Sequence, residues 1–196
     1  CRQNFTILTT DGYWNSDSNY TNVNEQDNNA GPTITGPGNQ SYTYAAVAPY
    51  ASADSNTLAD VAMRYWKSDL RSDLVNQVPT TNSNPAFWQH MVTFGISIGL
   101  KGEVDPNGPL PGMSGGPANW PNPNDGPSSG DLHRIDDLYH ASVNGRGSFL
   151  AASNPDEFTD GLRASLASIV ERTGSFSNLS ANSTQLTSGS RSYQGS

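Results

Sequence analysis

The residues best suited to metal chemistry stand close together between positions 131 and 143. They are His133, Asp136, Asp137 and His140. Their spacing of i, i+3, i+4 and i+7 places them on one face of a helix, where imidazoles and carboxylates could bind Zn²⁺. The plainer alternative is that the acids stabilise the start of the helix while His140 packs or caps. Because zinc sites usually have a better-fixed ligand set, we favour this alternative.

Asp11 is a second candidate for metal binding. It follows a run of β-branched and aromatic residues at 4–10 and precedes Gly12, a pattern typical of a buried strand that ends in a turn. The carboxyl ends of parallel strands are where open α/β sheets bind ligands, and a carboxylate suits Mg²⁺, Ca²⁺ or Mn²⁺. One carboxylate cannot hold such an ion usefully, so we expect no metal in this chain alone.

The polar segment after Asp11 has some of the spacing of a calcium-binding EF-hand loop. Its relevant residues are Asp17, Asn19, Thr21, Glu25 and Asp27. The sixth position is Asn22 where the EF-hand has glycine, and the twelfth is Asn28 where it has glutamate. The sequence therefore predicts a solvated polar loop here. Neither a Gly-x-Ser-x-Gly nucleophile elbow nor a phosphate-binding loop is present.

Aromatic residues gather in or beside two long polar stretches. They are Tyr13, Trp14, Tyr20, Tyr42, Tyr44, Tyr50 and Trp120. Aromatic rings among Asn, Ser and Gly make adaptable contact surfaces for partners. The alternative, which we favour, is that each ring anchors its own loop onto the domain.

Cys1 is the single cysteine, so an internal disulfide is excluded. Three possibilities stay open for its thiol. It pairs with a cysteine outside this chain, it stays free, or it carries the lipid of a bacterial lipoprotein. A strand-like run begins within a few residues of Cys1, whereas a lipoprotein normally has a flexible tether there, so the lipoprotein is the weakest of the three.

Composition narrows the class of protein. The 196 residues carry 10 basic and 18 acidic side chains, a net charge of −8, which disfavours nucleic acid as a partner. Only 34% of the residues are hydrophobic, and Asn, Ser, Thr, Gly and Pro make up much of the rest, as in loop-rich extracellular proteins. No apolar run reaches the length of a membrane span, and no signal peptide is visible.

Periodic apolar segments predict how these residues are positioned. We expect strands at 4–10, 90–99 and 148–152, and helices at 57–70, 131–143 and from 155 to about 173. Thr57 and Asp60 fit a capping box, Asn144-Gly145 is a helix stop, and Asn154-Pro155 a helix start. Residues 13–56 and 101–130 are predicted loop insertions, and 175–196 a linker.

The alternation of strands and helices predicts a parallel sheet flanked by helices. Buried parallel strands need a neighbouring strand on each side and helices packed on both faces of the sheet. Three strands and three helices are too few to provide this. The sequence therefore predicts an α/β fold that is about half of a doubly wound, Rossmann-type domain. The strand edge left open by the missing half should pair with another segment or another chain.

Three phrases of the sequence are similar to the PilC/PilY family of bacterial type IV pilus adhesins. They are residues 56–70 (NTLADVAMRYWKSDL), 85–93 (PAFWQHMVT) and 135–147 (IDDLYHASVNGRG). The strand end Leu8-Thr9-Thr10-Asp11-Gly12 resembles the "TDG" strand end of von Willebrand factor A domains. The resemblance covers about 1–174, apart from the two insertions, and implies the C-terminal half of an A domain with a β-propeller beyond the linker.

The family also implies a metal site and partners. The A-domain adhesion site combines an Asp-x-Ser-x-Ser loop, a threonine and the aspartate of the TDG strand, and only Asp11 matches it here. A divalent cation, Mg²⁺ or Ca²⁺, is thus expected in the complete domain. The implied partners are the rest of the parent adhesin or neighbouring copies, minor pilus subunits and an unidentified host or surface receptor, at a pilus tip outside the cell.

We therefore expect a non-enzymatic adhesion and pilus biogenesis protein that acts through loop contacts. Two rivals stay open. One is a metal-dependent hydrolase that uses the helix at 131–140, and the other is a purely structural filament subunit. Cys1, which has no internal partner, is the residue we expect to form a disulfide with a cysteine outside the chain.

Overall fold

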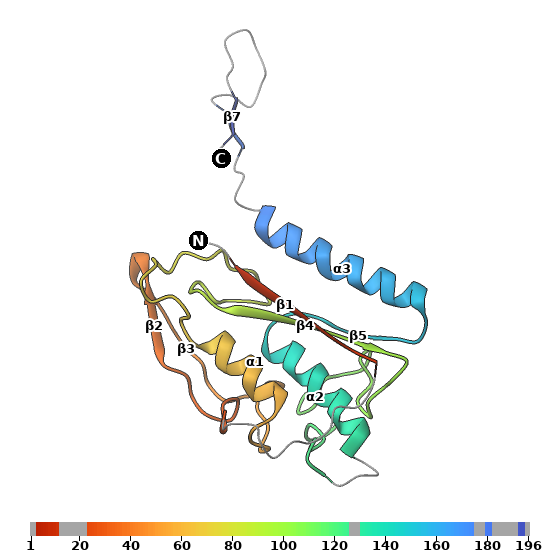
Figure 1. Ribbon diagram of the computed structural model, residues 1–196. Helices are drawn as coiled ribbons and strands as arrows, with labels where there is room; N and C mark the ends of the chain where they lie inside the picture. The colour runs from red at the N-terminus through yellow and green to blue at the C-terminus, as the bar shows by residue number, and fades with distance from the viewer. Residues whose placement is uncertain (1–2, 12–22, 126–129, 175–178, 182–191, 195–196) are drawn as a thin grey trace.

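The computed structural model describes residues 3–11, 23–125, 130–174, 179–181 and 192–194. Its main body has three layers, with a parallel sheet between a pair of helices and a single long helix (Figure 1). This arrangement confirms the predicted α/β fold with a small parallel sheet.

The sheet consists of β1 (Asn4–Thr10), β4 (Met91–Ile98) and β5 (Phe149–Ala152), in the order β1-β4-β5. Both strand pairs are parallel, with Asn4 opposite Met91 and Gly95 opposite Phe149. The central strand β4 is almost completely buried, which explains why its sequence is apolar or small on both faces. All three strands lie within one residue of their predicted bounds.

Two helices cover one face of the sheet, and one helix covers the other (Figure 1). The pair is α1 (Leu58–Lys67) and α2 (Gly130–Asn144), and the single helix is α3 (Pro155–Gly174). Gly145 and Gly147, just after α2, leave no room for a side chain, because a Cβ there would collide with Thr93 of β4. The α2 end therefore lies directly against the sheet.

Helix α1 begins as the sequence predicts. The Thr57 side chain accepts the Asp60 N–H at 3.0 Å, while the Asp60 carboxylate accepts the Thr57 N–H at 3.0 Å, which completes the capping box. The helix ends at Lys67, three residues before the predicted end, because Ser68 has an extended backbone.

The first insertion is more ordered than predicted. It contains an antiparallel hairpin of β2 (Thr33–Gly36) and β3 (Gln40–Thr43), joined by a single turn of 3-10 helix at Pro37–Asn39. It also contributes to the core, which the prediction of a mere loop missed. The buried members of this core cluster are Ile34, Tyr44, Met63, Trp66, Ala86, Phe87 and Trp88.

The second insertion has no helix or strand over its described part, 101–125. It is nevertheless attached through a smaller core cluster, in which Val104 and Trp120 pack against Tyr139 of α2. Trp120 meets Tyr139 edge to face, with ring centroids 5.3 Å apart. Both insertions thus contribute buried side chains to the domain.

The segment predicted as a linker contains two short strands, β6 (Leu179–Ala181) and β7 (Ser192–Gln194). They pair with each other in antiparallel fashion and do not join the main sheet. None of the helices within the described ranges has the length and apolarity needed to cross a membrane.

Candidate functional site

The four α2 residues predicted to share a face are all buried, but they reach different partners. The Asp136 carboxylate accepts the N–H groups of Glu103 and Val104, at 2.9 and 3.0 Å. His133 lies 2.9 Å from the Asn122 carbonyl through Nδ1, and 3.3 Å from a Glu103 carboxylate oxygen through Nε2. These two side chains therefore fasten the second insertion onto α2.

Asp137 and His140 hold other segments. The Asp137 carboxylate accepts the N–H groups of Leu58 and Ala59, both at 2.9 Å, and so caps the start of α1 from a neighbouring helix. His140 Nε2 donates to the Tyr50 carbonyl at 2.7 Å, since a carbonyl can only accept.

The geometry gives no support to a zinc site on α2. Over the part of the chain that the structure describes, none of the four residues belongs to a group of three or more metal-ligating side chains. The spacing that suggested zinc instead places the four side chains on one side of α2, where they contact the second insertion, the start of α1 and the Tyr50 carbonyl. Each of the two acids accepts backbone N–H groups that would otherwise be buried without partners, which is closer to the structural role that the sequence analysis favoured.

Asp11 lies where the sequence places it, in a bend directly after β1, and it is exposed. Among the described residues, Asp11 belongs to no group of three or more side chains that could together hold a metal ion. The proposed role of Asp11 as part of an adhesion metal site therefore stays a prediction about the complete domain. Cys1, Tyr13, Trp14 and Tyr20 lie outside the described residues.

An acidic group that sequence reasoning missed joins the first insertion to α1. It comprises Glu25, Asp27 and Asp60, whose ligand oxygens lie within 4.8 Å of one another, and we call it the acidic clasp. Asp27 and Asp60 are fully buried, so the prediction that this stretch is a solvated loop is wrong for Asp27. No local signal marks Asp27, because its partner Asn144 is 117 positions away in sequence.

The oxygens of the acidic clasp are engaged by protein donors. One Asp60 oxygen accepts the N–H groups of Gln26 and Asp27, at 2.6 and 3.3 Å, and the other accepts the N–H and hydroxyl of Thr57. Asp27 accepts the Ser52 N–H at 2.7 Å and the Asn144 amide at 2.9 Å. A cation would have to compete with these donors for the same lone pairs, so the clasp acts mainly as an internal fastening.

Burial changes the charge of these groups. It raises the pKa of Asp27 to about 8, opposed by the Ser52 N–H and reinforced by the charges of Asp60 and Glu25. Burial also raises the pKa of Asp137 to about 7, although the α1 N–H groups pull it down. Burial lowers the pKa of His140 to about 3, against the effect of the Tyr50 carbonyl. Asp27 thus holds a proton at neutral pH, and His140 is uncharged.

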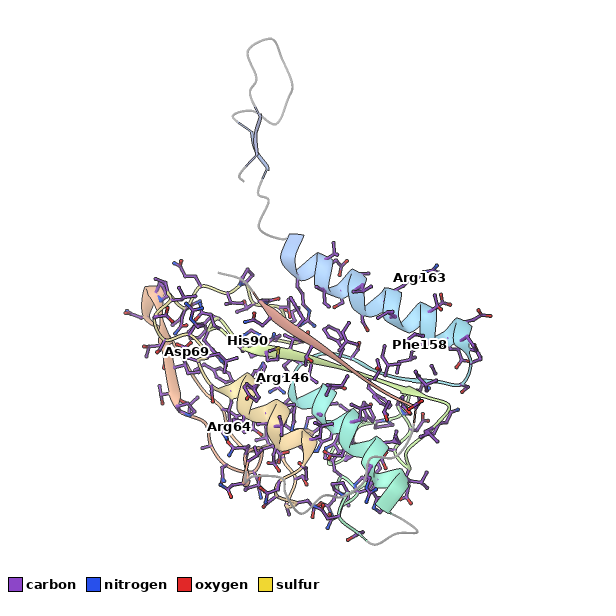
Figure 2. All side chains as sticks on the ribbon, viewed as in Figure 1. Arg64, Asp69, His90, Arg146, Phe158 and Arg163 are labelled. Carbon is purple, nitrogen blue, oxygen red and sulfur yellow. The ribbon has the colours of Figure 1, made fainter. Side chains whose placement is uncertain are left out.

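Arg146 is buried between the first insertion and the core. Its guanidinium lies 3.6 Å from the centroid of the Tyr50 ring and 3.8 Å from that of the Trp66 ring. Figure 2 shows Arg146 at the junction of α1, α2 and the sheet. Asn144 and Arg146 are 0% and 6% exposed, so the predicted helix stop at Asn144-Gly145 is buried.

The described aromatic residues of the insertions point inward. Tyr44 is 2% exposed and Trp120 is 6% exposed, in agreement with the favoured interpretation that these rings anchor their loops onto the domain. Tyr42 and Tyr50 are partly buried and pack against the same core cluster. Rings of this size gain more free energy by packing against Trp66 and Trp88 than by staying exposed on a loop.

Three relatives match most of the chain. The type IV pilus biogenesis factor PilY1 of Pseudomonas aeruginosa strain PAK is 32% identical over 181 residues, which cover 80% of this chain and 15% of the relative. PilY1 of strain UCBPP-PA14 is 30% identical over 203 residues, which cover 90% of this chain and 17% of the relative. The chain thus spans about a sixth of the length of these relatives. No family model and no solved structure matches it.

Proposed function

This chain belongs to the PilC/PilY family, and from that premise we propose that it is a non-enzymatic part of a pilus adhesion and biogenesis protein. The observation that carries the proposal is the identity of about 30% to PilY1 over 80–90% of the chain. The chain would then act outside the cell, at the pilus tip, through surface contacts and assembly with the rest of its parent protein.

The use of the polar side chains supports a role without bond chemistry. The residues that a hydrolase would need on α2 hold backbone N–H and carbonyl groups of three separate segments. General acid–base catalysis requires a side chain that can reach a substrate proton, and these side chains are buried against their partners. We therefore keep the non-enzymatic function as the proposal.

A chimera tests the biogenesis role. The matching segment of P. aeruginosa PilY1 is replaced by this chain, and surface pili and twitching motility are measured in a strain that lacks its own PilY1. We expect surface pili to be restored, and a chimera with Trp66→Ala, which removes a fully buried ring, to fail. A chimera that is made and exported normally but gives no pili would contradict the proposal.

The open edge of the sheet suggests how the chain is assembled. β1 is the terminal strand of the sheet, and among the described residues no strand pairs with its outer side. An unpaired edge is a template for another strand, so we propose that the rest of the parent protein, or a second copy, completes the sheet there. The completed domain would then bring further ligands to Asp11 for a Mg²⁺ or Ca²⁺ ion.

Light scattering tests this completion. The chain alone should self-associate, and adding the preceding segment of the parent protein should convert it to a defined complex. If the chain stays monomeric and stable and does not bind the added segment, the β1 edge needs no partner.

A further inference from the structure

A cleft of about 630 Å³ separates the two insertions. One wall comes from residues 48–54 of the first insertion, and the other from residues 111–125 of the second. It lies beside the acidic clasp but is lined by different residues. Its polar lining consists of Asn28, Ser52, Asp54, Asn119, Asn122 and Asp125.

The charge of the cleft is negative. Asp54 contributes a carboxylate from one wall and Asp125 from the other, while no Lys, Arg or His stands among the described lining residues. Burial raises the pKa of Asp54, the Ser52 hydroxyl opposes this, and the charge of Asp125 adds to it. The two carboxylates thus repel each other electrostatically, and a positively charged group bound between them would reduce this repulsion.

The rest of the lining is Trp120 and small, mostly apolar residues. Ala48, Ala51 and Ala53 lie on one wall, with Pro111 and Ala118 on the other. Val47 and Met113, which adjoin lining residues in sequence, are 52% and 48% exposed. A ligand with an aliphatic chain that ends in a positive charge fits an apolar wall beside two carboxylates. A lysine side chain is such a ligand.

Other ligands fit less well. Sugars commonly stack on an aromatic face, but Trp120 is 6% exposed, and its ring already lies 4.3 Å from His140 in a stacked arrangement. Its indole N–H is also engaged, by the Pro49 carbonyl at 2.7 Å. A metal ion would find two carboxylates in the described lining, fewer than the acidic ligands that calcium sites usually gather.

We propose that this cleft docks a lysine side chain from a basic segment of a partner protein. The aliphatic stem lies along the alanine wall, the ammonium group binds Asp54 and Asp125, and side-chain amides such as that of Asn119 bind the partner's backbone. The proposal concerns the class of partner and stands on the cleft itself, independently of the pilus role.

The test is an NMR titration of the full chain with a peptide that contains two lysines among alanines and has an acetylated N-terminus and an amidated C-terminus. The backbone amide chemical shifts of the chain are recorded at each peptide concentration. We expect shifts in the cleft residues, and at least about tenfold weaker binding when norleucine replaces lysine. The double variant Asp54→Asn with Asp125→Asn should lose binding to a similar extent. Raising the salt from about 0.05 M to about 0.5 M should weaken binding severalfold.

A matched control is Asp156→Asn with Asp160→Asn, which removes two exposed acids of α3 and should leave binding unchanged. The melting temperatures of both double variants show whether the fold is kept. Equal binding by the norleucine peptide, equal binding by the cleft variant, or no binding at millimolar peptide would each overturn the proposal. So would shifts of the same amides by calcium chloride or a neutral monosaccharide in place of the lysine peptide.

Discussion

The two faces of the sheet are covered in different ways. On one face, α1, α2 and both insertions bury large rings, and Trp66 and Trp88 are 0% exposed. On the other face, α3 alone lies across the sheet (Figure 1). Leu166 on α3 is 47% exposed. The chain therefore closes one face with its own residues and leaves the other partly open.

This difference shows what the insertions contribute. On the closed face they replace the cover that further strands and helices would give, by means of the acidic clasp, the Arg146 stack and the hydrogen bonds from α2. The β1 edge and the flank of α3 have no such cover within the described residues. They form the surface on which, in our proposal, the rest of the parent protein packs.

The largest expected effect is the loss of a ring from the closed face. Trp66→Ala should lower the free energy of unfolding by about 3–5 kcal/mol, because it leaves a cavity among Tyr42, Tyr44 and Trp88 and frees the Arg146 guanidinium. Urea unfolding followed by circular dichroism measures this. A loss below about 1 kcal/mol would mean that the closed face is not the stable part.

Removing the cap that α2 gives to α1 should have the next largest effect. Asp137→Ala leaves the N–H groups of Leu58 and Ala59 without their acceptor, at a cost of about 1–3 kcal/mol. The comparison variant is Asp156→Ala in the exposed first turn of α3, where only about 0.3–1 kcal/mol is expected. If both variants lose the same unfolding free energy, the polar contacts of the closed face are no more stabilising than an exposed helix end on the open face.

The buried acids should make stability fall as the pH rises. The folded chain keeps a proton on Asp27 up to about pH 8, whereas the unfolded chain loses it near the ordinary aspartate pKa of 3.8, so the folded state binds more protons in this range. His140 acts in the opposite direction, because its folded pKa of about 3 is below the ordinary 6.5, but only below about pH 6.5. The net loss should therefore be clearest between pH 6.5 and 8.

Asp27→Asn is the variant that checks this pH effect. It keeps the shape of the side chain and removes the titration, so the unfolding free energy should vary less with pH between 6.5 and 8 than in the parent chain. The slope due to one proton is about 1.4 kcal/mol per pH unit. An unchanged slope in the variant would place the titrating group elsewhere, with Asp137 as the next candidate.

The smallest effect is expected on the open face. Leu166→Ala should change the stability of this chain by no more than about 0.5 kcal/mol, since the side chain is 47% exposed. In the full parent protein the same substitution should cost more if another segment covers α3 there. Equal effects in the two proteins would argue that this flank stays exposed after assembly.

Local sequence signals predicted the regular elements well. The capping box at Thr57 and Asp60, the β-branched run of β1 and the Asn154-Pro155 helix start each act over a few residues, so the sequence displays them directly. The family resemblance was equally local, since it rested on three short phrases, and the overall identity to the PilY1 relatives agrees with it.

The insertions were where prediction failed. Asn, Gly and Pro in residues 23–56 predicted a loop insertion, solvated around Asp27, but Ile34 enters the core and Asp27 is buried. The buried Tyr44 agrees with the favoured interpretation that the ring anchors its loop. Average polarity misleads here because a few apolar or acidic side chains, spaced without a period, are enough to anchor a long segment. The contacts that bury them join residues tens of positions apart.

The sequence by itself determined the order of strands and helices, the parallel sheet and the family, because these depend on periodicity and short-range phrases. Only the tertiary structure decided which groups the acidic and histidine side chains bind. The α2 face that looked like a metal site satisfies backbone groups of the loops and α1, and the acids that looked solvated form a buried fastening. The physical reason is that a buried polar group must find a partner wherever the fold brings one, and sequence spacing does not show where that is.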